Sequence, residues 1–465
     1  MDVVKDKDMF NGGNADVSAD VDVDDPCMDS PLGIRNPEGW RQIRWDDLCK
    51  LSAPTFVQVP ARFEAAVYEV KLTALRAIRE CRRVGQDEEH AWKLFLAIDQ
   101  LLFARGSANA DEETCAAARD VRLDMFHQGQ WKTLLDDQRI HRSRPAPRSQ
   151  KERQRMKVAR VRTLAAAREE GRALATLTAQ DLAPATEETL RKLRALFPNG
   201  EPVRDLPEAP RTTEPVREQV REAQAGCLRR PGRLVGPGPM GARAEHWETF
   251  YKDCDARELY LDVLEWITWG DLPDVVLRQM RSCRVIALAK DGAGVRPLQL
   301  GMLHRRMAHK GLVRAAKSEL REAAGPHQFA VGTDSGAERL VAALYTAVHK
   351  QPNRVVVALD TRAAFQNIQR GPMLRELAAR APSIYRAVAA WYREDATHKW
   401  MSSRGVFHDI RNSRGVQQGC PFGPAAYAIG SRPAVDCILT RCEAEGIAVE
   451  VMAYRDDTYL VADAV

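Results

Sequence analysis

The chain has 465 residues, of which 45% are hydrophobic, so it is long enough to bury the cores of two or three domains. Its 69 Lys and Arg residues exceed its 64 Asp and Glu residues by only five charges, which alone indicates no particular partner. No stretch approaches the roughly twenty apolar residues of a membrane span, the N-terminus has no signal-peptide pattern, and the ten cysteines form no Cys-x-x-Cys pair. We therefore expect no membrane association and an intracellular protein with reduced thiols.

The first half of the chain divides into three regions by composition. Residues 1–35 begin with an acidic stretch containing Gly, Asn and Ser, which predicts a disordered tail. Residues 36–135 carry apolar side chains at helical spacing and predict a helical N-terminal region. Residues 136–230 combine basic and Pro-rich stretches and predict a helical linker, with helical pieces at Lys157–Thr176 and Thr186–Phe197.

A dense basic run, Arg139–Arg162, lies within this linker. Beyond Pro145 and Pro147 its charges could line a helix that binds a phosphate backbone without sequence preference. The candidate nucleic-acid-binding residues are Arg148, Lys151, Arg153, Arg155 and Lys157. A solvated linker or a nuclear import signal explains the same run equally well. We expect the protein in the nucleus, with the cytoplasm as the alternative.

Residues 284–299 predict a strand, a Gly-containing turn and a second strand. Lys290 and Arg296 flank the turn, so both cations can point the same way. This arrangement suits a hairpin that folds over a triphosphate, with charge-assisted bonds from both side chains. A surface hairpin with two incidental basic residues is the alternative.

Two acidic sites follow, each at the end of a predicted strand. Arg354–Leu359 predicts a buried strand that ends at Asp360. Asp456 and Asp457 follow Tyr454 between two apolar runs, which predicts a hairpin with adjacent carboxylates at its tip. Adjacent like charges cost stability unless a cation neutralises them, so the pattern favours a metal site. Asp-rich solvated turns are nevertheless common, so this turn alone does not decide the question.

Between the acidic sites, a Gly- and Pro-rich segment leads into the apolar helix predicted at Ala425–Ile429. Taken together, the segments resemble a reverse transcriptase, most closely the enzymes of non-LTR (LINE-type) retrotransposons and group II introns. Asp360–Phe365 is similar to the first palm motif, Gly415–Pro424 to the Gly-x-x-Gln-Gly-x-Pro motif, and Tyr454–Asp457 to the Tyr-x-Asp-Asp motif. The resemblance covers roughly residues 284–465 and is absent from the first two hundred.

The resemblance implies catalysis by two Mg²⁺ ions, with Mn²⁺ as a substitute, placed about 4 Å apart. Mg²⁺ prefers oxygen ligands and few protein carboxylates, which suits aspartates at a strand end and at a hairpin tip. The implied catalytic residues are Asp360, Asp456 and Asp457, and the implied metal residues are these three with Thr361.

The resemblance also implies a nucleotide site made by Lys290, Arg296, Phe365, Gln418 and Gly419. The Phe365 ring would lie under the sugar and exclude ribonucleotides; alternatively, it is an ordinary core residue. Gln418 and Gly419 would form the floor of the pocket, because glycine allows close backbone approach. A turn that caps the following helix is the alternative for this pair, and both roles can hold together.

The expected fold is α+β: a right-hand polymerase palm and fingers without a thumb, preceded by a mostly helical N-terminal region. We assign the fingers to residues 231–350 and a truncated palm to residues 351–465. The expected function is RNA-directed DNA synthesis for a retrotransposon-type element, with an RNA template, a DNA primer and dNTPs as partners. The oligomeric state is left open.

The sequence departs from the family pattern at three places. Gln366 replaces a second Asp, which is tolerable because that residue is not a metal ligand. Two departures favour an alternative function: Arg455 places a guanidinium beside the metal carboxylates, and the chain stops at Val465 before a thumb. The alternative is a catalytically inactive nucleic-acid-binding remnant. A third function, RNA-directed RNA synthesis, is disfavoured by Phe365, because such enzymes usually place a polar residue there.

Overall fold

The computed structural model describes residues 32–51, 54–104, 112–140, 149–290, 292, 294–350 and 353–463. Most of the predicted acidic tail and the candidate residue Arg148 lie outside the described residues. No helix in the described ranges combines the length and the apolar character that a bilayer crossing requires.

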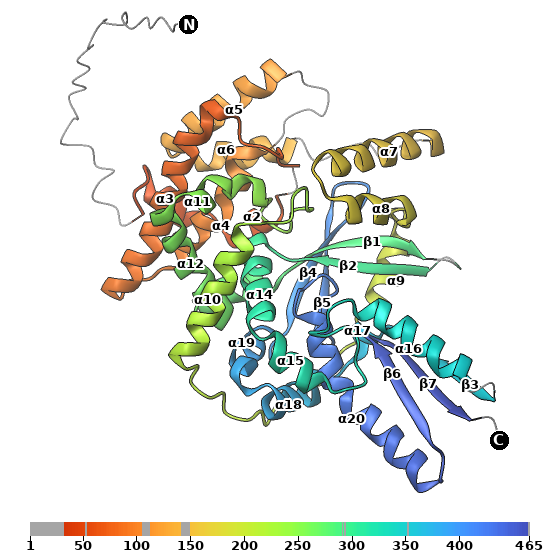
Figure 1. Cartoon of the computed structure of the whole chain (residues 1–465). Helices are drawn as coiled ribbons and strands as arrows, with labels where there is room; N and C mark the ends of the chain where they lie inside the picture. The colour runs from red at the N-terminus through yellow and green to blue at the C-terminus, as the bar shows by residue number, and fades with distance from the viewer. Residues whose placement is uncertain are drawn as a thin grey trace, which may run out of the picture.

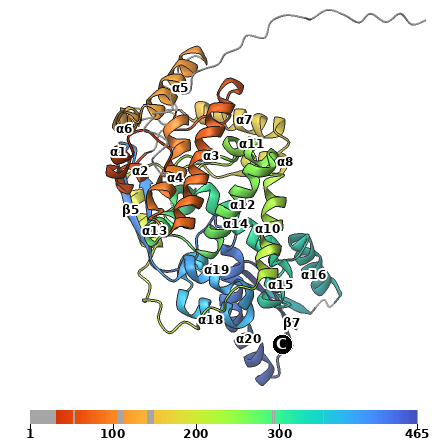
Figure 2. The ribbon, with the colours of Figure 1, turned by 90° about the vertical axis from the view of Figure 1, so that its left-hand side faces the viewer.

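Helices make up the N-terminal third of the chain and lie at the end of the molecule opposite to the palm strands (Figures 1 and 2). α3 and α4 pack against each other, and α4 is buried on all sides, including at Lys93, Asp99 and Gln100. The helices are α1 (Pro37–Gln42), α2 (Trp45–Cys49), α3 (Ala61–Val84), α4 (Glu89–Phe103), α5 (Glu112–His127) and α6 (Trp131–Ile140).

The basic region forms a helical hairpin instead of one continuous helix. α7 (Gln150–Ala166) begins at Ser149, whose side chain accepts a hydrogen bond from the Glu152 N–H. The chain then reverses at Arg168, which adopts a left-handed φ of 57°, and α8 (Glu170–Thr178) packs back against α7. The helical piece predicted at Lys157–Thr176 is therefore two helices.

A four-stranded sheet in the order β2-β1-β4-β5 joins two strands from the residues expected to form the fingers with two from the residues expected to form the palm. Its strands are β1 (Arg284–Lys290), β2 (Gly294–Leu300), β4 (Ala396–Met401) and β5 (Phe407–Asn412). α9 (Glu187–Leu196) covers this sheet, packing Leu190 and Leu193 against Val285, Trp400 and Ile410. Part of the region assigned from sequence to a linker thus contributes a helix to the fingers.

The palm is a three-stranded antiparallel sheet in the order β3-β7-β6. Its strands are β3 (Arg354–Leu359), β6 (Val449–Tyr454) and β7 (Asp457–Asp463), with α16 (Gly336–Lys350) packed on β3 and β6. The prediction that Arg354–Leu359 is buried is wrong, since its Val355, Val356 and Val357 side chains are 42–49% exposed. β3 is an edge strand of this sheet. Its apolar sequence therefore did not ensure that other elements pack on both of its faces.

The remaining helices join the fingers, the palm and the N-terminal region. They are α10 (Glu214–Leu228), η1 (Ala244–Trp247), α11 (Glu248–Lys252), α12 (Cys254–Trp269), α13 (Asp274–Arg281), α14 (Leu303–Ala315), α15 (Lys317–Ala324), α17 (Ala364–Asn367), α18 (Arg370–Arg380), α19 (Pro382–Tyr392) and α20 (Gly423–Ala444). One hydrophobic cluster runs from the N-terminal helices through α12 and α14 to the first half of α20. The helical N-terminal region therefore shares its core with the polymerase-like part.

A buried polar network lies inside this shared core. The Lys71 ammonium is 2.9 Å from the Asp99 carboxylate, and the Trp247 indole N–H donates to the same carboxylate at 2.7 Å. Burial alone would raise the pKa of Asp99, but Lys71 and His246 beside it outweigh burial and hold that pKa below its usual range. The network fixes α3 and α4 to the segment that begins α11.

Candidate active site

The adjacent carboxylates lie at the tip of the β6–β7 hairpin. Tyr454 pairs with Asp457, so Arg455 and Asp456 form a two-residue turn. Arg455 has a φ of 60° and Asp456 does not have a positive φ, which is the pattern of a type II′ turn. Such turns match the twist of the flanking strands, so the hairpin presents Asp456 in a defined position.

A buried glutamine from a distant loop holds this turn. The side-chain oxygen of Gln328 accepts a hydrogen bond from the Arg455 N–H at 2.8 Å, and its side-chain nitrogen donates to the Arg455 main-chain carbonyl at 3.2 Å. The same side-chain oxygen accepts from the Ala330 N–H at 3.1 Å. Because Gln328 is only 8% exposed, these bonds are shielded from water and fix the main chain immediately before Asp456.

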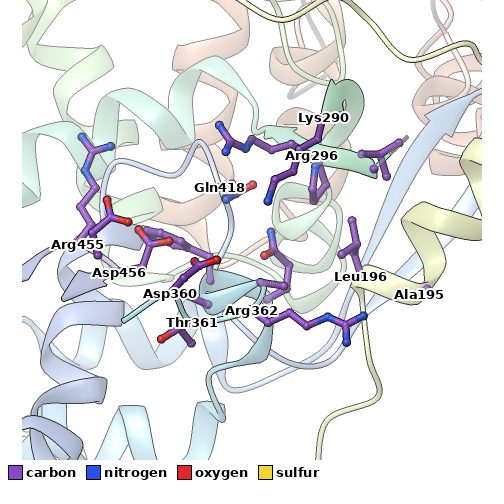
Figure 3. A pocket seen from close by; sticks show the side chains of 18 of the residues that line it. Ala195, Leu196, Lys290, Arg296, Asp360, Thr361, Arg362, Gln418, Arg455 and Asp456 are labelled. Carbon is purple, nitrogen blue, oxygen red and sulfur yellow. The ribbon is translucent and has the colours of Figure 1, made fainter. Parts of the chain in front are cut away.

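Asp360 reaches the same place from the neighbouring strand. β3 and β7 pair up to Leu359 and Thr458, so the next residue, Asp360, lies level with the turn (Figure 3). Burial raises the pKa of Asp456, and the charges of Asp457 and Asp360 raise it further, against the opposing effects of its own N–H and of Arg455. The two strands thus bring the Asp360 and Asp456 carboxylates close enough to repel each other.

Arg455 does not neutralise this pair. Its guanidinium lies over the Tyr454 ring, 5.5 Å from the ring centroid, and points away from Asp360 in Figure 3. In the described ranges, no ion pair within 4 Å joins Arg455 to Asp456 or Asp457. The guanidinium therefore leaves the carboxylate pair open on its cleft side.

The segment after Asp360 forms the floor of the site. Phe365 is 7% exposed, and its ring stacks on Tyr427 of α20 with the centroids 5.2 Å apart. Burial raises the pKa of Tyr427, while a hydrogen bond with Thr361 lowers it and the Asp456 charge raises it. Phe365 is a packed core residue that also lines the cleft, and its role as a gate beneath the nucleotide sugar stays a prediction.

The β1–β2 hairpin supplies the opposite, cationic side. Lys290 pairs with Gly294 and Leu288 pairs with Arg296, so Lys290 and Arg296 lie on the same face of the hairpin. Both side chains are exposed, line the cleft and point toward it from above Asp360 in Figure 3. No carboxylate of the described residues pairs with either cation, so both are available to an anion in the cleft.

The Gly- and Pro-rich segment joins the two sides. Gln418 lines the cleft, and its N–H donates to the Gln299 side chain of β2 at 2.8 Å. Gly419 does not line the cleft: it adopts a φ of 111°, and a Cβ there would lie 2.4 Å from the Gln299 carbonyl oxygen. The expectation that Gly419 forms part of the pocket floor is thus replaced by a packing role against β2.

The comparisons with known proteins agree with this geometry. Residues 289–464 match the family described as reverse transcriptase (RNA-dependent DNA polymerase). This segment is a reverse transcriptase domain. The match confirms the resemblance to reverse transcriptases for this part of the chain but does not distinguish the non-LTR and group II enzymes from other members; the mixed helix and sheet with a helical N-terminal region fits the expected α+β polymerase fold.

Other similarities are weaker. No curated protein matches the chain. Among solved structures it is similar to an apo telomerase from Candida tropicalis truncated from its C-terminal domain, with 11% sequence identity and a TM-score of 0.30. The similarity covers 40% of this chain and 44% of the telomerase chain, so less than half of that structure's length is spanned.

The reverse transcriptase domain receives one wall of its cleft from outside the matched segment. Lys192, Ala195 and Leu196 of α9 line the same cleft, of about 700 Å³, as Asp360 and Asp456. Sequence analysis assigned these residues no role, because α9 precedes every recognised motif and its amphipathic pattern indicates only packing. Gln328 was missed for a similar reason, since its partner Arg455 lies 127 positions away.

The oxygen atoms that the cleft offers are ligands of the kind that a divalent cation prefers. Asp360 and Asp456 supply two carboxylates without an ion-pair partner in the described residues, and Asp457 lies beside them, exposed. Within the same part of the chain, no three His, Cys, Asp or Glu side chains form a closed metal cluster. Mg²⁺ bound with nucleotides needs only one or two carboxylates, because phosphates and water complete its shell.

Proposed function

We propose that the chain is an RNA-directed DNA polymerase of a non-LTR retrotransposon-type element, which extends a DNA primer on an RNA template with dNTPs. One observation carries the proposal: a single antiparallel sheet brings Asp360 and Asp456 to one cleft, opposite Lys290 and Arg296. A nuclear location, where a DNA target would be available, belongs to the same proposal.

The carboxylates and the cations have complementary roles. Asp360, Asp456 and the Thr361 main chain would hold two Mg²⁺ ions, and Asp457 supports them from the rim. When bound, such ions activate the primer hydroxyl and neutralise the leaving phosphates. Lys290 and Arg296 bind the triphosphate from above, and this orients the α-phosphate toward the carboxylates.

The nucleotide sugar is selected at the floor. The Phe365 ring is held in place by its stacking on Tyr427, so it cannot easily move aside for a ribose 2′-hydroxyl. Gln418 lies at the same floor, where its amide can bond to the template or to the nucleotide. The product is accordingly DNA.

An inactive remnant is less well supported. One of its arguments was a guanidinium that competes with the metal, and Arg455 instead packs over Tyr454. The Gln328 side chain also bonds to the main chain of the turn, and this contact needs no substrate. These two features favour a working site.

The proposal is tested by the choice of template and sugar. A DNA primer is annealed to matched RNA and DNA templates, and each is offered dNTPs or NTPs with Mg²⁺. We expect extension with dNTPs on the RNA template. Extension only with NTPs would indicate an RNA polymerase instead, and extension on DNA but never on RNA would exclude reverse transcription.

A further inference from the structure

The α7–α8 hairpin carries a strongly basic helix that the catalytic proposal does not use. α7 contains six Lys or Arg residues and one acidic residue, Glu152. Leu164 is its only buried side chain, and Met156 and Val158 are 45% and 37% exposed. A helix with almost no packed face gains little stability from the core, so its surface is available to a partner.

The cations on the inner side of α7 hold the hairpin to the body. The Arg160 guanidinium donates to the Leu234 carbonyl, and Arg172 of α8 donates to the same carbonyl at 3.0 Å. Within the hairpin itself, Lys157 donates to the carbonyl of Ala179, the residue that caps α8, at 3.1 Å. Beyond α8, the Ala183 N–H donates to the Ala287 carbonyl of β1 at 2.9 Å. The hairpin is therefore anchored on the fingers at several points (Figure 1).

The cations on the outer side have no such partners. Lys151, Arg155 and Arg162 are four and seven residues apart, so they lie on one face of α7, opposite to Leu164. All three are exposed, and no ion pair or hydrogen bond joins their side chains to the described residues. They form a fixed row of three positive charges about 16 Å long at 1.5 Å per residue.

The composition of the hairpin indicates the chemistry of its partner. Residues 149–179 contain no Phe, Tyr or Trp, so they offer no surface on which unpaired bases could stack. α7 also has no apolar face, which an interfacial membrane helix requires. A rigid row of cations without aromatic or apolar neighbours fits a regular array of phosphates.

We propose that Lys151, Arg155 and Arg162 bind the phosphate backbone of a double-stranded nucleic acid outside the catalytic cleft. Arg153 and Lys157 lie on the opposite face of α7, the face of Leu164, so they are not part of this row; Lys157 instead bonds to the end of α8. The hairpin lies beyond β1 and β2, on the side away from the palm strands β6 and β7 (Figure 1). The fingers would thus hold a duplex segment while the cleft remains free for synthesis.

The test compares two triple variants of the full chain. K151Q/R155Q/R162Q removes the row, and R76Q/R79Q/K132Q removes three exposed cations from the N-terminal helices. Binding of a labelled blunt 20-base-pair duplex and of a 20-nucleotide single strand is measured by fluorescence anisotropy from about 50 to 200 mM salt. Thermal melts check that both variants fold.

We expect the first variant to bind duplex DNA at least tenfold more weakly at low salt. Its log–log salt slope should fall by about 2.7, because each lost phosphate contact removes about 0.9. The second variant should keep the wild-type slope within about 0.5. Parallel measurements with DNA, RNA and hybrid duplexes identify which duplex is preferred.

Three results would overturn the proposal. The salt slope of duplex binding could be equal for both variants, or the first variant could lose as much affinity for the single strand as for the duplex. Alternatively, the first variant could lose affinity only for anionic phosphatidylserine vesicles. Binding is measured without turnover, so this test is independent of the polymerase proposal. If the polymerase proposal fails and this one holds, the chain binds duplexes without extending them. If instead the polymerase proposal holds and this one fails, K151Q/R155Q/R162Q should extend a primer at saturating template as fast as the wild type does.

Discussion

Replacing Gln328 should damage catalysis, although the sequence assigned this residue no role. Gln328→Met keeps the length and the burial of the side chain but removes two hydrogen bonds to the Arg455 main chain and one to Ala330. At about 0.5–1.5 kcal/mol each, the two bonds to Arg455 contribute about 1–3 kcal/mol to holding the turn. Once the turn loses this stabilising free energy, it no longer fixes the Asp456 carboxylate.

We expect the rate of primer extension to fall by about 10- to 100-fold, since a displacement of about 1 Å at a reacting centre can cost about 100-fold. The Mg²⁺ concentration at half-maximal rate should rise, because the carboxylate pair is less well formed. The KM for dNTP should change little, as Lys290 and Arg296 lie on a different hairpin. Single-turnover extension over a Mg²⁺ series measures all three quantities.

A matched control separates positioning from general stability. Gln224 is also buried and donates to the Thr268 hydroxyl at 2.7 Å, but it lies outside the cleft. Gln224→Met should lose a comparable free energy of unfolding and keep kcat within about twofold. If Gln328→Met loses stability as this control does, without a larger loss of kcat, the clamp does not position Asp456.

Three further changes have defined outcomes. Phe365→Val should admit ribonucleotides by opening space beneath the sugar; unchanged sugar selectivity in primer extension would make the ring a core residue only. Asp456→Asn should raise the melting temperature without divalent ions, since it removes a carboxylate whose ionised form is disfavoured by burial and by Asp457, and should remove any stabilisation by Mg²⁺. Melting curves with and without Mg²⁺ measure both effects, and an equal Mg²⁺ response in the variant would count against a metal at Asp456. Burial lowers the pKa of His398 to about 3, and the Cys283 N–H donates to its ring, so the fold requires the neutral imidazole. Stability should therefore fall as pH drops below about 6.5, at up to about 1.4 kcal/mol per pH unit, and His398→Gln should remove this part of the slope in denaturant titrations; an unchanged slope would contradict it.

The positions of the candidate catalytic residues were readable from sequence because they depend on local structure. Asp360 ends a strand and Asp456 occupies a hairpin tip, and both elements follow from apolar runs that end at polar residues. The shared face of Lys290 and Arg296 follows from strand periodicity and a short turn. Local rules of this kind do not require knowledge of the tertiary fold.

The features that sequence missed all depend on contacts between distant segments. The Gln328 clamp joins positions 127 residues apart, and the α9 wall comes from a segment with no motif. The exposure of β3 depends on which elements cover the sheet, which apolar composition cannot indicate. The break between α7 and α8 occurs at Arg168, which adopts a left-handed φ, and no glycine or proline stands at this position to indicate it.

The central claim is that Asp360 and Asp456 form the catalytic centre of an RNA-directed DNA polymerase. The most direct measurement is Mg²⁺-dependent extension of a DNA primer on an RNA template by the wild-type chain, Asp456→Asn and Asp255→Asn. Asp255 is an exposed aspartate of α12 and supplies a matched charge change away from the cleft. We predict extension by the wild type and by Asp255→Asn, and none by Asp456→Asn. Equal extension by all three chains, or none by the wild type while it still binds the template, would contradict the claim.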